Sequence, residues 1–167
     1  KHVQTMKYIK TTILIAGMGG ELIIHILSEG EKVCKKASEL ILQPQSDIRK
    51  VREYLREHQY KIVDEDMVCE DGKYYPMMRA INVEEDCFWE KVNEETKVAC
   101  DIYGQLLLRN GNQVLRRFLV RQHRQLTQII QTLQAQPQSE AIDQRIAQVR
   151  EELHYNESAY TILGAIK

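Results

Sequence analysis

The sequence contains few of the features that place a protein in a special class. It has no run of about 18 or more apolar residues, which excludes a membrane-spanning helix, and no charged and apolar leader opens its 167 residues. We therefore expect a cytoplasmic protein. The formal net charge is only −1, from 23 basic and 24 acidic residues. Any binding of nucleic acid must then come from local basic patches and not from bulk charge.

Cysteine pairs of the kind that hold zinc are also missing. The four cysteines are Cys34, Cys69, Cys87 and Cys100, and no two of them form a Cys-X-X-Cys motif. Zinc ribbons and knuckles need paired ligands at short spacing. We therefore expect reduced, partly buried thiols and no metal site.

The first half of the chain alternates strand and helix patterns. Residues 11–16 form a β-branched, apolar run that predicts a strand covered on both faces, and this run stops at the glycine-rich segment 17–20. Apolar residues at helical spacing follow and end near Gly30. A second apolar run, residues 39–43, predicts another buried strand, which we expect Pro44 to end.

One more helix and a hairpin complete this half. Ser46 and Asp47 are suited to cap the helix. Its predicted buried stripe is Ile48, Val51, Tyr54 and Leu55. Two extended runs, residues 60–69 and 74–83, flank Glu-Asp-Gly-Lys at 70–73, and Asp-Gly in that position predicts a type I′ turn. The order predicts an α/β fold with half of a doubly wound sheet, and since half a sheet is short for a domain, we expect an N-terminal portion to be missing.

The second half is helical. Residues 84–95 are acidic and irregular and predict a linker or surface loop, and the segment 136–139 breaks the helical pattern and offers Ser139 as a cap. The two apolar stripes on either side of that break are Leu115, Leu119, Leu126, Ile130 and Leu133, and then Ile142, Ile146, Val149, Leu153 and Tyr160. We expect an antiparallel helical hairpin, with domains at 1–94 and 95–167.

Two candidate sites follow from this order. The first lies at the ends of the predicted strands, where open α/β sheets bind ligands. Its residues are Ala16, Gly17, Met18, Gly19 and Gly20, then Gln43 and Pro44, and then Lys73 in the hairpin turn, with Tyr74 and Tyr75 after it. Glycines admit a ligand to the backbone, and a glutamine amide is suited to a nucleobase edge. The same residues also suit a tight strand–helix turn, a turn amide and a solvated lysine.

The second candidate site is a basic stretch. Its basic residues are Arg109, Arg116, Arg117, Arg121, His123 and Arg124, with no acidic residue from 109 to 124. Arg117, Arg121 and Arg124 have i, i+4, i+7 spacing and so share one helix face. Such a face can follow phosphates, although it is equally compatible with a solvated surface.

Several segments, in the same order, resemble one bacterial family. They are Ile-Leu-Ile-Ala-Gly-Met-Gly-Gly at 13–20, Leu-Ile-Leu-Gln-Pro at 40–44, Glu-Asp-Gly-Lys-Tyr-Tyr at 70–75 and Tyr-Gly at 103–104. As a set they resemble the tRNA (adenine-22 N1)-methyltransferases, the TrmK family. The resemblance implies the C-terminal half of a Rossmann-like class I methyltransferase sheet, followed by a coiled-coil-like helical domain.

The resemblance also implies a cofactor, a partner and site roles. The cofactor is S-adenosylmethionine, bound along residues 16–20, and the partner is tRNA, contacted by the hairpin residues from Lys73 to Tyr75 and by the arginines. We expect Gln43 and Pro44 to take the catalytic position, where the glutamine amide would orient the adenine. The family's first strand and its Gly/Asp loop have no counterpart in residues 1–10, so we expect this chain alone to be inactive.

Two other functions remain open from the sequence. One is a non-catalytic module that binds RNA or protein through the helical hairpin. The other is an oxidoreductase that uses residues 17–20 as a phosphate turn. The absence of a Gly-X-Gly-X-X-Gly motif and of an acidic ribose ligand argues against this function. A sheet edge left open by truncation also predicts a tendency to self-associate.

Overall fold

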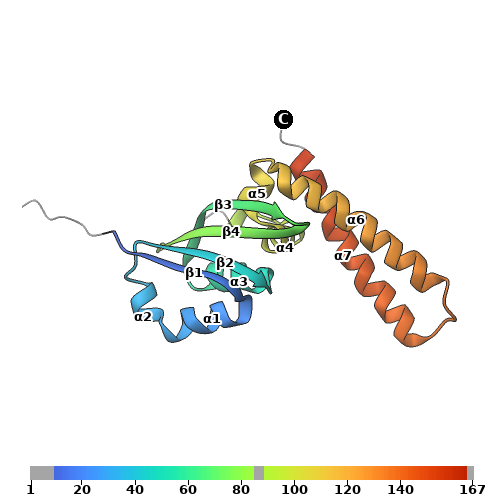
Figure 1. Ribbon diagram of the computed structural model, residues 1–167, viewed down its shortest axis with the longest axis horizontal. Coiled ribbons are helices and arrows are strands. Elements are labelled where there is room, and N and C mark those ends of the chain that lie inside the picture. Colours follow the sequence, from blue (N-terminus) through green and yellow to red (C-terminus); the bar gives the residue numbers. More distant parts are fainter. Residues whose placement is uncertain (1–9, 85–88, 165–167) are drawn as a thin grey trace, which may run out of the picture.

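The structure is a computed structural model that describes residues 10–84 and 89–164. In it a four-stranded sheet with helices is followed by a long pair of helices that projects as an arm (Figure 1). The elements are β1 (Thr12–Gly19), α1 (Gly20–Glu29), α2 (Glu31–Cys34), β2 (Glu39–Ser46), α3 (Ile48–Glu57), β3 (Tyr60–Glu70), β4 (Lys73–Asn82), the short 3₁₀ helix η1 (Trp89–Lys91), α4 (Glu94–Tyr103), α5 (Gln105–Arg109), α6 (Gln113–Gln134) and α7 (Glu140–Gly164).

The sheet has the strand order β1-β2-β4-β3. β1 pairs with β2 in parallel, whereas β4 is antiparallel to both β2 and β3. Consequently β1, β2 and β3 run in the same direction and end at one side of the sheet, which we call the carboxyl rim. The predicted order of parallel units followed by an antiparallel hairpin is confirmed.

The first hydrophobic core lies between the sheet and helices α1 and α3. Ile15 on β1 and the predicted α3 residues Val51 and Leu55 are buried in it. The prediction that β1 is covered on both faces is wrong, because the side chain of Leu14 is 66% exposed. Successive side chains of a strand point to opposite faces, so Leu14 lies on the face opposite α1.

Two predicted boundaries at the carboxyl rim are corrected. Pro44 does not end β2, which continues to Ser46. The pairing with β4 stops at Leu42, so Pro44 does not interrupt that ladder with its missing N–H. Asp47 is the N-cap residue of α3, but its side chain makes no capping hydrogen bond. Its carboxylate instead accepts a hydrogen bond from the Ser46 hydroxyl at 2.9 Å.

The β3–β4 hairpin agrees with the sequence. Asp71 and Gly72 both have positive φ, 48° and 75°, as a type I′ turn requires. The expected irregular segment 84–95 contains η1 and the start of α4, and residues 85–88 lie outside the described part of the chain.

The arm consists of α6 and α7, which pack side by side (Figure 1). The break between the helices is where it was expected, and the Ser139 hydroxyl accepts a hydrogen bond from the amide of Ile142 at 3.3 Å. The predicted stripe on α7 needs one correction: Tyr160 is 43% exposed, while Asn156 is 1% exposed and occupies the interface. Asn156 has a heptad spacing from the buried Val149, and a stripe drawn from apolar residues alone misses it.

None of the helices in the described residues has the length and apolar character needed to cross a bilayer. The described residues also hold no group of three or more His, Cys, Asp or Glu side chains placed to bind a metal ion. Cys34, Cys69 and Cys100 are free thiols, and Cys87 lies outside the described residues.

Candidate cofactor and RNA site at the carboxyl rim

A β-bulge in β1 brings the glycine segment to the glutamine of β2. Ala16 pairs with Gln43 and Met18 pairs with Pro44, so Gly17 is the extra residue between them. Gly17 has φ 76°, a conformation that suits glycine and few other residues. Its amide donates a hydrogen bond to Oε1 of Gln43 at 2.9 Å. The two strand ends that the sequence singled out are therefore in direct contact.

The three glycines of this segment differ in their surroundings. A Cβ atom at Gly17 would have no atom within 4 Å, so the surface beside it is open. A Cβ at Gly20 would lie 2.6 Å from the carbonyl oxygen of Ser46, and one at Gly19 would lie 3.1 Å from its hydroxyl. Gly20 thus lets the β1–α1 and β2–α3 connections pack together, as the tight-turn interpretation expected. The open surface of the segment lies next to Gly17 and Met18, whose side chain is 37% exposed.

The amide of Gln43 is only partly engaged. Oε1 accepts the Gly17 bond, and Nε2 lies 3.5 Å from the Pro44 carbonyl oxygen, at the limit for a hydrogen bond. An amide oxygen has two lone pairs. Gln43 therefore retains an acceptor site on Oε1 and a weakly used donor, and both lie at the carboxyl rim beside the open surface of Gly17.

The hairpin turn contacts the arm. The Arg121 side chain of α6 donates a hydrogen bond from Nη1 to the Gly72 carbonyl oxygen at 2.7 Å. The ring of Tyr74 makes an edge contact with Phe118, with 5.0 Å between centroids. Lys73 is exposed and Tyr75 is half-buried. The expected site residues thus form two groups, one around Gly17 and Gln43 and the other around the hairpin turn and α6.

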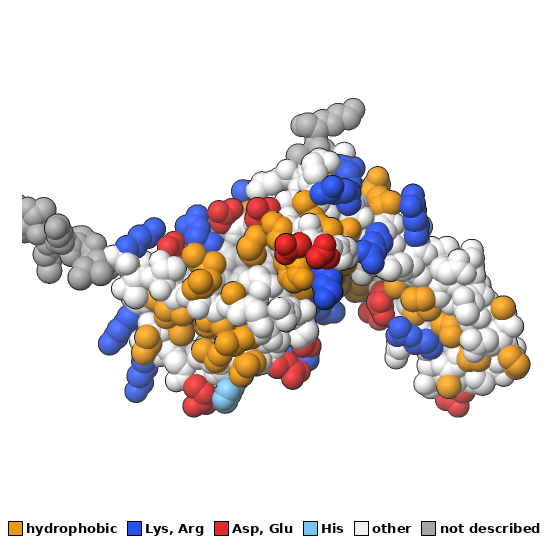
Figure 2. All heavy atoms as spheres, viewed as in Figure 1, with side chains coloured by type: hydrophobic (Ala, Val, Ile, Leu, Met, Phe, Trp, Pro, Cys, Tyr) orange, Lys and Arg blue, Asp and Glu red, His pale blue; other side chains and the backbone are white. Residues whose placement is uncertain are grey.

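The arginines of α6 form a basic hollow beside this turn. We call it the arginine hollow; it has a volume of about 460 Å³, and its lining is Arg116, Arg117, Val120, Arg121, Arg124, Gln125 and Tyr160. Figure 2 shows several Lys and Arg side chains gathered over the first half of α6. None of the described residues that line the hollow is acidic. Arg109 is exposed at the end of α5 and does not line the hollow.

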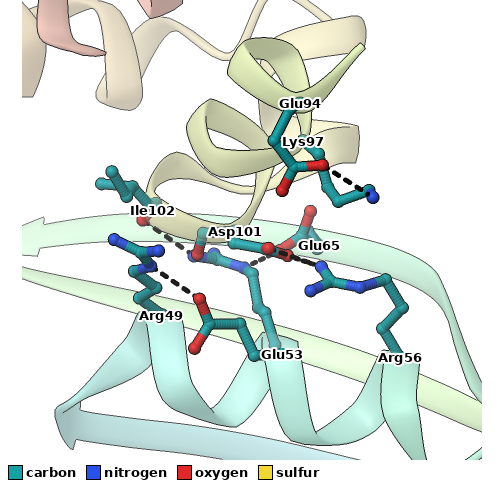
Figure 3. Close-up of polar contacts among 9 residues, drawn as sticks. Arg49, Glu53, Arg56, Glu65, Glu94, Lys97, Asp101 and Ile102 are labelled. Atoms are coloured by element: carbon teal, nitrogen blue, oxygen red, sulfur yellow. Dashed lines mark hydrogen bonds and ion pairs between the residues drawn. The ribbon is translucent and has the colours of Figure 1, made fainter. Parts of the chain in front are cut away.

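A buried polar cluster, which the sequence did not reveal, fixes the first helices of the second half to the sheet (Figure 3). Nε of Arg52 on α3 lies 2.9 Å from a Glu65 carboxylate oxygen on β3, and both side chains are at most 3% exposed. The Arg52 Nη1 group donates to the carbonyl oxygens of Asp101 and Ile102 at 3.1 and 3.0 Å. Glu65 also accepts a hydrogen bond from the Leu106 amide at 2.9 Å.

Asp101 extends this cluster on α4. Arg56 forms an ion pair with its carboxylate. Burial is the largest influence on Asp101 and raises its pKa, while the hydrogen bond and charge of Arg56 oppose that rise. Burial also raises the pKa of the neighbouring Cys100 thiol to about 12. Cys100 therefore stays protonated and inert at neutral pH.

Comparison with known proteins identifies the family. The family model named TrmK: tRNA (adenine(22)-N(1))-methyltransferase matches residues 2–158. The chain belongs to the TrmK family. A curated relative of this name from Bacillus subtilis (strain 168) is 38% identical over 81 residues, which are 48% of this chain and 34% of the relative.

Solved structures share the fold of this TrmK-family chain. An uncharacterized protein from Listeria monocytogenes serotype 4b has a TM-score of 0.78 at 29% identity, over 89% of this chain and 62% of that one. The crystal structure of the B. subtilis M1A22 tRNA methyltransferase TrmK has a TM-score of 0.74 at 27% identity, with the same two coverages. The fold also matches Streptococcus pneumoniae Sp1610 in complex with S-adenosyl-L-methionine, at 22% identity, TM-score 0.70, and 90% and 60% coverage. The chain thus spans less than two thirds of the length of these relatives.

Proposed function

We propose that this TrmK-family protein transfers a methyl group from S-adenosylmethionine to N1 of adenine 22 in tRNA, in the cytoplasm. The observation that carries the proposal is the 2.9 Å hydrogen bond from Gly17 to Gln43, which joins two strand ends at the carboxyl rim beside an open surface. In this proposal residues 1–94 belong to the methyltransferase domain and residues 95–167 form the helical domain that contacts tRNA.

The backbone of Ala16, Gly17 and Met18 would hold part of the cofactor. The bulge at Gly17 leaves room that a side chain would otherwise take, and the partly exposed Met18 offers an apolar contact. The fit does not extend past Gly19, where the Ser46 side chain lies. When bound, S-adenosylmethionine supplies an electrophilic methyl group on a sulfonium. The S. pneumoniae relative of the same fold, solved with this cofactor, supports the assignment.

Methyl transfer to N1 of adenine requires little acid–base catalysis from the protein. N1 of adenine carries a lone pair and no proton, so the residues need to align the base, exclude water and tolerate the positive charge of the product. Gln43 would use the free lone pair of Oε1 to accept a hydrogen bond from the 6-amino group of adenine. Pro44, buried beside it, would fix the position of Gln43.

The hairpin and α6 would bind the RNA around the target base. Because base pairing hides N1, the adenine must be unpaired or flipped out of its stack. Lys73 is exposed and Tyr75 is half-buried, so both are able to contact RNA. Tyr74 packs against Phe118, and in this position it supports the Arg121 guanidinium, whose carbon lies 5.9 Å from the Tyr74 ring centroid.

Methyl transfer to tRNA transcripts tests the proposal. The product of the complete gene is incubated with S-adenosylmethionine labelled in its methyl group and with transcripts that carry adenine or guanine at position 22. We expect labelling of the adenine transcript only, at N1. Tight binding of the adenine transcript without methyl transfer, under conditions in which the B. subtilis enzyme is active, would contradict the proposal and favour a non-catalytic RNA-binding module.

A further inference from the structure

Tyr160 on α7 is more exposed than the sequence pattern predicts. The sequence pattern placed it in the helix–helix interface, but its side chain is 43% exposed. The guanidinium carbon of Arg116 lies 5.7 Å from the centroid of its ring. The Nη2 group of Arg116 in turn donates a hydrogen bond to the Leu163 carbonyl oxygen at 3.3 Å. An aromatic ring is thus held at the surface beside a cation that is itself anchored to α7.

Two adjoining hollows share this ring. The arginine hollow has a volume of about 460 Å³, and a second hollow of about 390 Å³ lies between α6 and α7. Both are lined by Val120, Arg124 and Tyr160. The ring therefore stands between a hollow lined by four arginines and a hollow lined by both apolar and polar side chains, and a planar ligand can contact both.

The charge around Tyr160 selects an anionic partner. Four arginines line the arginine hollow, and no acidic side chain is among the described residues that line it. In the second hollow the Glu157 carboxylate lies 3.2 Å from Nε2 of His123. Arg117 and Arg124 are exposed and project from the same helix face. Phosphates recognise such guanidinium groups, and nucleobases stack on an exposed aromatic ring.

We propose that Tyr160 is a stacking platform for one unpaired base of the tRNA, with Arg117 and Arg124 on the flanking phosphates. This inference rests on the proposed function, which makes tRNA the substrate. The arginine hollow also reaches the carboxyl rim, because Arg121 lines it and donates to Gly72 at the tip of the hairpin. RNA that lies along the hollow from Tyr160 is thereby led toward the β3–β4 turn.

Binding measurements with two replacements at position 160 test the platform. Tyr160→Leu removes the ring but keeps an apolar side chain, and Tyr160→Phe keeps the ring. Each variant of the complete gene product is titrated with the tRNA transcript, after its thermal unfolding has been compared with that of the wild type. We expect Tyr160→Leu to bind about 5- to 20-fold more weakly, within the range known for stacking of one base. Tyr160→Phe should restore the affinity.

A second titration separates stacking from a general effect of the mutation. Short single-stranded RNA and the same RNA with abasic sites are bound to the wild type and to Tyr160→Leu. Loss of the bases should weaken RNA binding by the wild type about 5-fold or more. It should scarcely affect binding by Tyr160→Leu, because that variant has no ring on which a base can stack. Equal losses in both proteins would overturn the platform while leaving the proposed function intact. If the wild type binds no tRNA at all, both proposals are wrong.

Discussion

At the level of single residues, Gly17 and Gln43 decide the geometry of the carboxyl rim. Gly17 adopts a positive φ that places its amide 2.9 Å from Oε1 of Gln43, and this contact holds the glutamine side chain against the bulge of β1. Gln43 then has one lone pair and one weakly used donor to offer. The Gln43 side chain both binds the backbone of β1 and is the proposed contact to adenine. Removal of the side chain alone would therefore change the structure of the rim and the contact to adenine together.

A cycle of changes in protein and RNA separates these effects of Gln43. Methyl transfer is measured in single turnovers with wild type and Gln43→Ala, each on tRNA that carries adenine or purine, which lacks the 6-amino group, at position 22. A hydrogen bond between Oε1 and that amino group predicts a coupling of roughly 3- to 10-fold. Replacement of adenine by purine should therefore slow methyl transfer by the wild type more than it slows methyl transfer by Gln43→Ala. Equal slowing of both proteins would remove Gln43 from contact with the adenine.

The buried pair of Arg52 and Glu65 gives a prediction about stability. Arg52→Met leaves the Glu65 carboxylate, 0% exposed, without its cation, and we expect a loss of about 3–5 kcal/mol in the free energy of unfolding. Arg52→Met combined with Glu65→Leu should be less destabilising than Arg52→Met alone, since no unpaired buried charge remains. Urea unfolding measures all three free energies. A double variant that is less stable than Arg52→Met would show that the pair has no such coupling.

At the level of secondary-structure elements, local patterns predicted most of the fold. The alternation of apolar runs with segments of helical spacing located β1, α1, β2 and α3, and Asp-Gly located the hairpin, because each of these signals acts within a few residues. The errors arose where neighbours distant in sequence decide the outcome. Pro44 is tolerated because the β4 ladder has already ended. The Arg52–Glu65 pair joins residues 13 positions apart on different elements, and a local pattern cannot reveal it.

The interface between α6 and α7 also depends on contacts between residues that are distant in the sequence. Asn156 donates hydrogen bonds to the Leu119 carbonyl oxygen at 3.1 Å and to the Gln122 amide oxygen at 2.9 Å. Gln122 also accepts a hydrogen bond from the Tyr103 hydroxyl of α4 at 2.9 Å. Asn156 and Gln122 together thus link three helices, which fixes their register.

Replacement of Asn156 tests this link. Asn156→Ala should lower the free energy of unfolding by about 1–3 kcal/mol, because it leaves a cavity and removes one buried and one partly buried hydrogen bond. Gln148→Ala, an exposed change on the same helix, is the matched control and should alter stability by less than about 0.5 kcal/mol. Thermal or urea unfolding of both variants gives the comparison. Similar small effects from both would show that the hydrogen bonds of Asn156 contribute nothing measurable.

At the level of the whole molecule, an α/β part and a helical arm meet at the β3–β4 turn (Figure 1). The Arg121–Gly72 hydrogen bond and the Tyr74–Phe118 contact join them at one end, and the cluster around Arg52 secures α4 and α5 to the sheet. This arrangement sets the arginine hollow beside the turn that follows β3. The proposed cofactor surface and the proposed RNA surface are thereby held in a fixed relation, as methyl transfer to one chosen base requires.

The salt dependence of tRNA binding tests the arm as the RNA surface. Arg117→Gln with Arg124→Gln removes two exposed cations and leaves Arg121, which also holds the hairpin turn. We expect weaker binding and a plot of log affinity against log salt that is shallower by about 1 to 2. Arg145→Gln with Arg150→Gln, an equal charge change on α7, is the control and should alter the slope less. The same slope change in both pairs would show that the arginine hollow has no special role.

Photochemical cross-linking tests most directly where the target base meets the protein. A tRNA with 8-azidoadenosine at position 22 is bound to the complete gene product and irradiated, and the linked peptides are identified by mass spectrometry. Our account predicts links to the segment 16–20 or to Gln43, which lie together at the carboxyl rim. Efficient links found only on the arm or on the outer surfaces of α1 and α2, with none at the carboxyl rim, would contradict it.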